Sequence, residues 1–141
     1  MMQFDLSPGD ELPPMVRQTG FPHWNRYAAV NDEFIPIHMD DEAAREAGFP
    51  IAIGMGNLVW SYFHNMLRDW MGEGGRIEKI AARYWQPNLR DSILTLRAKV
   101  VDVSRETGAA RVTFELLAQD ASERRLATGE AVVRIAAPAA L

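Results

Sequence analysis

The hydrophobic pattern of this chain changes its period once, and that change limits the folds open to it. From Met55 to Met71 the apolar residues recur at spacings of three and four, which is the period of an α-helix. Beyond Gly75 apolar and polar residues alternate, as they do in a β-strand with one buried face. A long helix followed by a run of strands indicates an α+β fold rather than alternating α/β.

Four strands are expected after the helix, separated by polar turns that contain Gly, Pro, Asn or Asp. We expect them to form an antiparallel meander whose buried face packs against the helix. The expected strands are Ile77–Gln86, Ser92–Val103, Ala110–Gln119 and Arg125–Ile135. Before the long helix we expect a strand around Met15–Thr19, a short helix over Trp24–Val30, and a second short helix that begins at Asp40–Glu42 and stops at Gly48.

A curved antiparallel sheet wrapped around one long helix is the hot-dog architecture. Single units of this architecture usually pair edge to edge, and the dimer interface completes the ligand site. The architecture therefore predicts a dimer, formed with a second copy or with another hot-dog chain.

Composition describes an ordinary globular chain and excludes several functions. The length of 141 residues predicts one domain over 1–141. A net charge of −4 without a Lys/Arg cluster argues against nucleic acid or an anionic membrane as partner. With no cysteine there is no disulfide or thiolate nucleophile. No apolar run approaches the roughly 20 residues of a membrane span, and the first ten residues do not resemble a secretory signal, so we expect a cytoplasmic protein.

A short acidic loop ending in a histidine is the first candidate for acid–base chemistry. Asp32 and Glu33 precede His38, and Pro36 between them limits the freedom of the backbone. A carboxylate and an imidazole held together can exchange protons with water near neutral pH. Spacing alone leaves Asp32 and Glu33 as equal candidates for the carboxylate.

The two isoleucines of this loop should favour that chemistry. Ile35 and Ile37 flank the proline, and we expect both to face the interior and to lower the local dielectric. No metal site is expected, because the histidines at 23, 38 and 64 form no recognised ligand pair with carboxylates.

The segment before the long helix offers a second candidate feature. Gly54, Met55 and Asn57 lie at the expected helix start, where free backbone N–H groups and the helix dipole could hold a developing oxyanion. Ordinary helix initiation with close packing is the alternative explanation of these glycine-containing residues.

These residues resemble the MaoC-like family of (R)-specific enoyl-CoA hydratases and dehydratases. The resemblance lies in Asn-Asp-Glu-Phe-Ile-Pro-Ile-His, ending at His38, in Ile-Ala-Ile-Gly-Met, ending at Met55, and in Trp-Gln-Pro at 85–87. Counting back from His38, the family's catalytic Asp falls on Glu33 and its preceding Gly on Asp32. The chain departs from the family pattern at Ile35, where an Asn is usual, and at Ile53, where a His is usual.

The resemblance implies reversible addition of water to a trans-2-enoyl-CoA, with Glu33 and His38 handling the water. Backbone N–H groups around Gly54 would stabilise the enolate oxygen, with Met55 and Asn57 on the substrate side. The acyl-CoA thioester would be the substrate, and no cofactor is expected.

Two other functions remain open. One is a non-catalytic or half-site subunit that binds acyl-CoA and needs a partner chain, which the changes at Ile35 and Ile53 suggest. The other is an acyl-CoA thioesterase, which would need a carboxylate on the long helix. Asp69, near the far end of that helix, is its only acidic residue.

Overall fold

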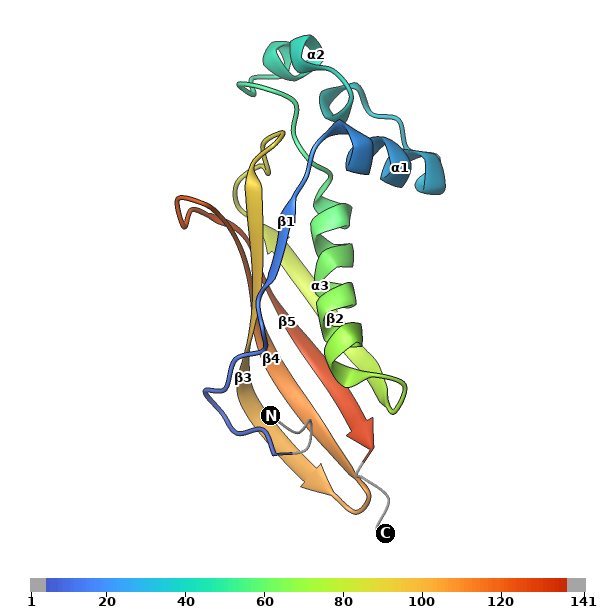
Figure 1. Cartoon of the computed structure of the whole chain (residues 1–141), viewed down its shortest axis with the longest axis vertical. Coiled ribbons are helices and arrows are strands. Elements are labelled where there is room, and N and C mark those ends of the chain that lie inside the picture. Colours follow the sequence, from blue (N-terminus) through green and yellow to red (C-terminus); the bar gives the residue numbers. More distant parts are fainter. Residues whose placement is uncertain (1–4, 137–141) are drawn as a thin grey trace.

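The computed structural model describes residues 5–136, in which one antiparallel sheet curves around a single long helix (Figure 1). Most expected elements are present, with ends shifted by one to three residues. In chain order they are β1 (Met15–Gln18), α1 (Phe21–Asn31), the 3-10 turn η1 (Pro36–His38), α2 (Asp41–Glu46), α3 (Gly56–Met71), β2 (Gly75–Tyr84), β3 (Ile93–Glu106), β4 (Ala109–Asp120) and β5 (Arg125–Ala136).

The strand order is β1-β3-β4-β5-β2, so the expected simple meander is wrong for β2. The strands β3, β4 and β5 are joined by tight turns and lie side by side as expected. However, β2 pairs with β5 at one edge, with Ile80 opposite Ala131, while β1 pairs with β3 at the other. The segment 85–92 connects β2 at one edge of the sheet to β3, which lies beyond β5 and β4, so it cannot be the hairpin turn of a simple meander.

The helix α3 packs its apolar stripe onto the concave face of the sheet (Figure 1). The residues that the stripe buries are Leu58, Val59, Tyr62, Phe63, Met66, Leu67 and Met71. The ring of Trp70 meets that of Phe114 on β4 edge to face, at 5.1 Å between centroids. Gly72 ends the helix with a positive φ of 60° and donates its N–H to the Arg68 carbonyl.

The helices α1 and α2 lie together at one end of the sheet, beyond the start of α3 (Figure 1). Asp40 caps α2 by accepting the Ala43 N–H at 2.8 Å, which confirms the expected acidic cap. Within residues 5–136, no helix combines the length and the apolar character needed to cross a membrane.

Candidate active site

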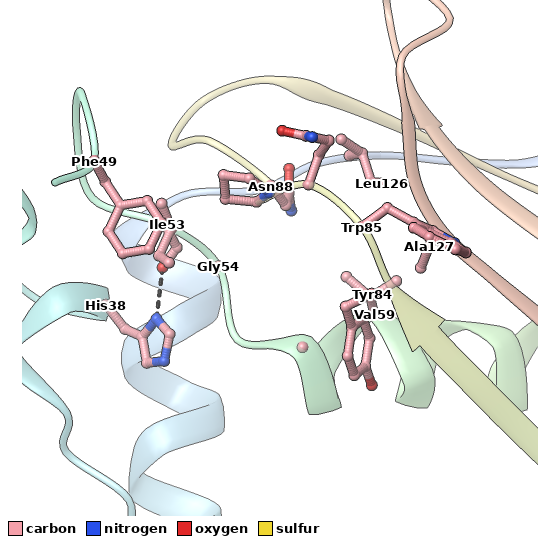
Figure 2. Close-up of a pocket in the computed structure, with 13 residues that line it drawn as sticks. His38, Phe49, Ile53, Gly54, Val59, Tyr84, Trp85, Asn88, Leu126 and Ala127 are labelled. Carbon is pink, nitrogen blue, oxygen red and sulfur yellow. Dashed lines mark hydrogen bonds between the residues drawn. The ribbon is translucent and has the colours of Figure 1, made fainter. Parts of the chain in front are cut away.

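A cavity of about 340 Å³ lies where the α1–α2 region meets the start of α3 and the end of β2 (Figure 2). Its walls are mainly apolar, with a few polar groups among them, as is usual for a small-molecule site. The lining residues are His38, Phe49, Ile53, Gly54, Gly56, Val59, Tyr84, Trp85, Gln86, Pro87, Asn88, Leu126 and Ala127.

His38 reaches this cavity in a fixed orientation. Its Nδ1 lies 2.7 Å from the carbonyl oxygen of Ile53, as Figure 2 shows. A carbonyl can only accept, so Nδ1 carries the proton and Nε2 is left free to accept one in the neutral ring. The Ile53 N–H donates to the Ile37 carbonyl at 3.2 Å, which ties the two segments together. The Ile53 side chain takes no part in these bonds, so the loss of the family's His at that position leaves the positioning of His38 intact.

Glu33 is not joined to His38 in the structure. It lies half-buried just after α1, with its backbone N–H on the Ala28 carbonyl, and does not line the cavity. Within residues 5–136, its carboxylate forms neither a hydrogen bond nor an ion pair, with His38 or any other residue. The two side chains share one loop without meeting.

Asp32 occupies a turn. It ends α1 with φ 53° and ψ 43°, a left-handed conformation that Asp tolerates and glycine prefers. Glycine is the residue expected here from the resemblance, so the backbone is compatible with the prediction that Glu33 rather than Asp32 is the candidate carboxylate. Asp32 itself is exposed.

Ile35 does not face the interior as expected. It is 39% exposed, whereas Ile37 is half-buried. Ile35 takes an extended conformation because it precedes Pro36, and this turns its side chain outward beside the exposed Phe34. The loop is therefore less apolar than the sequence suggested.

The start of α3 offers backbone donors, although not at the expected residue. The Gly54 N–H already donates to the Asn88 carbonyl at 2.7 Å. The N–H groups of Gly56 and Asn57 have no acceptor within the described chain, and Gly56 lines the cavity. Any oxyanion held by this helix end would therefore meet Gly56 rather than Gly54.

The side chains of Met55 and Asn57 lie away from the cavity. Met55 is 3% exposed and belongs to the hydrophobic core. Asn57 is exposed, and its carbonyl accepts the Ser61 hydroxyl at 2.8 Å. Of the expected site residues, the structure thus brings His38 and Gly54 together.

Sequence reasoning missed the contribution of the segment after β2. Asn88, 5% exposed, lines the cavity while its amide donates to Thr19 and accepts from Ser92. Burial raises the pKa of the Tyr84 phenol, and the nearby Tyr27 adds to that rise, so Tyr84 stays neutral. The Trp-Gln-Pro motif drew attention to this segment without indicating which side chains face a ligand.

Asp41 and Arg90 hold the two walls of the cavity together. The Arg90 guanidinium donates to both Asp41 oxygens, at 2.7 and 3.2 Å, and the Ala52 N–H adds a third bond at 3.0 Å. The hydrogen bond from Arg90, followed by that from Ala52, holds the pKa of Asp41 below its usual value. These bonds link α2 to the segments before α3 and after β2.

The histidine and acidic residues form no metal site in the part of the chain that the structure describes. No group of three or more of them is arranged to hold an ion there.

The curved sheet around α3 defines a hot-dog fold, and solved structures of this fold are similar over nearly the whole chain. An (R)-hydratase from A. caviae, described as involved in PHA biosynthesis, is 22% identical with a TM-score of 0.83, covering 92% of this chain and 97% of its own. A MaoC-like dehydratase from Rhodospirillum rubrum is 17% identical with a TM-score of 0.85 and 99% coverage of both chains.

A chain of the ChsH1–ChsH2 complex from Mycobacterium tuberculosis is 17% identical with a TM-score of 0.81, covering 92% of this chain and 98% of its own. A comparison with curated protein sequences finds no significant match. The sequence profile described as "MaoC like domain" matches residues 17–120. This chain belongs to the MaoC-like family.

Proposed function

We propose that this protein is a hydratase/dehydratase that interconverts a trans-2-enoyl-CoA and a (R)-3-hydroxyacyl-CoA. The observation that carries the proposal is the position of His38, whose Nδ1 is held by the Ile53 carbonyl while its free Nε2 is available at a largely apolar cavity. Membership of the MaoC-like family supports this function. Similarity to a protein described as an (R)-hydratase agrees with it.

In the hydration direction, His38 Nε2 takes a proton from a water molecule as the water oxygen bonds to the β-carbon. Electron density then moves onto the thioester oxygen, where the N–H of Gly56 at the α3 start stabilises the enolate. The dyad of His38 and Glu33 returns a proton to the α-carbon, so the net change is the addition of one water. Glu33 must turn toward the His38 ring for this step, and catalytic hydrogen bonds often tighten only when substrate binds.

In this proposal the acyl-CoA thioester is the substrate. The proposed chemistry uses only side chains and backbone donors, so it requires no cofactor. The cytoplasmic location expected from the sequence is kept as a prediction.

Loss of enoyl absorbance with a trans-2-enoyl-CoA tests the proposal. We expect Glu33→Gln and His38→Ala each to lower the rate by about 10²- to 10⁴-fold, the usual worth of a general acid or base. Asp32→Asn is the matched control, because it removes the neighbouring carboxylate at a position where Asn also tolerates the left-handed backbone. Full activity in Glu33→Gln, or a loss in Asp32→Asn equal to that in His38→Ala, would contradict the assignment.

A half-site subunit that works with another hot-dog chain is the second candidate. It is favoured by the lack of contact between the Glu33 carboxylate and His38. One of the similar structures is described as a complex of two differently named chains. An inactive purified chain that gains hydratase activity when a companion hot-dog chain is added would support this function.

An acyl-CoA thioesterase has less support. Asp69, the acidic residue expected to direct hydrolysis, is exposed and lies beside Met66 and Trp70 at a different hollow. Release of free thiol from acyl-CoA by the wild-type protein would nevertheless favour this function over hydration.

A further inference from the structure

Two arginines stack on one tryptophan beside the cavity. The Cζ atoms of Arg83 and Arg125 lie 4.1 and 4.5 Å from the centroid of the Trp85 indole. Trp85 lines the cavity directly after β2, and its Nε1 donates to the Thr128 hydroxyl on β5 at 2.8 Å. This hydrogen bond holds the indole in place, and the two guanidiniums that lie over it place two positive charges next to the cavity.

These two cations have no carboxylate partner among residues 5–136. Neither Arg83 nor Arg125 forms an ion pair in the described residues, and both are exposed. Five other cations of the sheet are paired with acids: Arg76, Lys79, Arg97, Arg111 and Arg134 each lie within 4.0 Å of a glutamate oxygen. In a chain with a net charge of −4, this pair is a local concentration of unneutralised positive charge.

Stacking leaves the hydrogen-bonding groups of both guanidiniums unused. A guanidinium contacts an aromatic ring through its face, while its N–H groups point outward in its own plane. No oxygen in the described residues accepts a hydrogen bond from the side chain of Arg83 or Arg125. Two like charges held close together repel each other, and a bound anion relieves that repulsion. Guanidiniums bind phosphate through paired N–H donors.

The acids near this group do not neutralise it. Glu115 on β4 shares a surface hollow with Arg125 and another with Arg83, without forming an ion pair with either. Glu130 is bound to Lys79 at 2.6 Å. Two arginines and one unpaired glutamate leave a net positive charge.

We propose that Arg83 and Arg125, held on Trp85, bind the phosphate groups at the nucleotide end of coenzyme A. This inference rests on the proposed function, because it places the phosphate-bearing end of the substrate beside the cavity in which His38 acts. The shared chemistry is that of a phosphorylated pantetheine thioester, which could come from coenzyme A or from a carrier protein. The two guanidiniums favour coenzyme A, which carries three phosphates where the carrier's pantetheine arm carries one.

Calorimetric titration of the full chain with coenzyme A tests the inference without any turnover. We expect Arg83→Gln and Arg125→Gln each to weaken binding by about tenfold, the usual worth of a charge-assisted contact. Arg76→Gln on the same strand is the matched control, because it removes the same charge from an arginine already paired with Glu78. Raising the ionic strength should weaken binding of the wild type more than that of the two variants.

Two further probes locate the recognised group. Pantetheine, which has no phosphate, should bind all variants equally. If Arg83→Gln and Arg125→Gln weaken the binding of 4′-phosphopantetheine as much as that of coenzyme A, the nucleotide assignment is overturned in favour of a carrier-protein arm. Equal coenzyme A binding by Arg76→Gln and the two test variants would overturn the inference altogether.

The inference and the proposed function can fail separately. If the variants lose coenzyme A binding while the wild type hydrates no enoyl-CoA, the site stands and the hydratase assignment falls. If the wild type is a hydratase and its KM for enoyl-CoA is unchanged in Arg83→Gln and Arg125→Gln, the function stands and the site falls.

Discussion

At the scale of single residues, the candidate site depends on backbone groups as much as on side chains. His38 is oriented by a carbonyl, that of Ile53, and the family's usual side chain at that position is not needed for this bond. Gly56 lines the cavity, and its N–H has no acceptor within residues 5–136. A sequence comparison sees side-chain identities, so it registers Ile53 as a loss although the contact that matters is retained.

Gly56 is predicted to be sensitive to substitution because of one neighbour. A Cβ at this position would lie 3.1 Å from the Tyr84 ring, which is closer than most real contacts. We expect Gly56→Ala to displace Tyr84, to destabilise the fold by about 1–3 kcal/mol as overpacking does, and to raise KM. Denaturant unfolding and initial rates measure the two effects.

Gly74→Ala is the control for that experiment. Gly74 has no positive φ, and a Cβ there would meet nothing within 4 Å. We expect the free energy of unfolding of Gly74→Ala to stay within about 0.5 kcal/mol of that of the wild type. Equal stability and equal KM in Gly56→Ala and Gly74→Ala would show that the position of the Tyr84 ring does not depend on Gly56.

At the scale of elements, the position of α2 depends on a few polar contacts rather than on a large core. Of the residues in α2, only Ala44 is fully buried. The bidentate bonds between Asp41 and Arg90, with the bond from the Ala52 N–H, attach this helix to the cavity walls. The loop that carries His38 leads directly into α2, so these bonds also restrain that loop.

The Asp41 contacts predict a pH-dependent contribution to stability. The pKa of Asp41 is lowered in the folded protein, so its ionised form is favoured by folding. The contribution is fully present above the ordinary aspartate pKa of about 4 and is lost as the pH falls through the lower folded-state value. We expect the stability difference between wild type and Asp41→Asn to be constant near pH 7 and to shrink below about pH 4.

Unfolding free energies measured across that range check this prediction. Asp40→Asn serves as the comparison, because Asn caps a helix about as well as Asp, and the Asp40 carboxylate accepts its hydrogen bond from Ala43 of α2 rather than from Arg90. A difference between wild type and Asp41→Asn that stays constant down to pH 2 would contradict the assigned role of the Arg90 bond.

At the scale of the whole molecule, the sheet has two open edges of unequal size. The edge strand β1 has 4 residues and β2 has 10, and the large exposed side chains of Tyr84 and Trp85 lie where β2 ends. Long unpaired edges attract further strands unless something covers them. Pairing between chains is therefore expected at β2 rather than β1.

We predict that the purified protein is a dimer in solution. Light scattering after size-exclusion chromatography should give twice the chain mass, with no fall in activity on moderate dilution. A stable monomer that hydrates enoyl-CoA at the full rate would contradict this prediction. A monomer that becomes active only with a second hot-dog chain would instead support the half-site function.

Much of the architecture followed from local pattern. The helix over Met55–Met71 and the strands after Gly75 were predictable because hydrophobic period reports directly on which face of an element is buried. The α2 cap at Asp40 was predictable because capping also depends on residues that are close together in the sequence. The place of β2 beside β5 was not, because strand order depends on contacts between distant segments.

The sequence by itself determined the fold class, the family and the loop on which the candidate chemistry lies, because each depends on residues close together in the chain. Only the tertiary structure showed that His38 lines the cavity and that Glu33 does not line it. It also showed that the Gly54 N–H donates its hydrogen bond to the Asn88 carbonyl. It also brought Arg83 and Arg125 onto Trp85. These outcomes depend on how segments separated by dozens of residues pack together, and spacing along a chain does not record that packing.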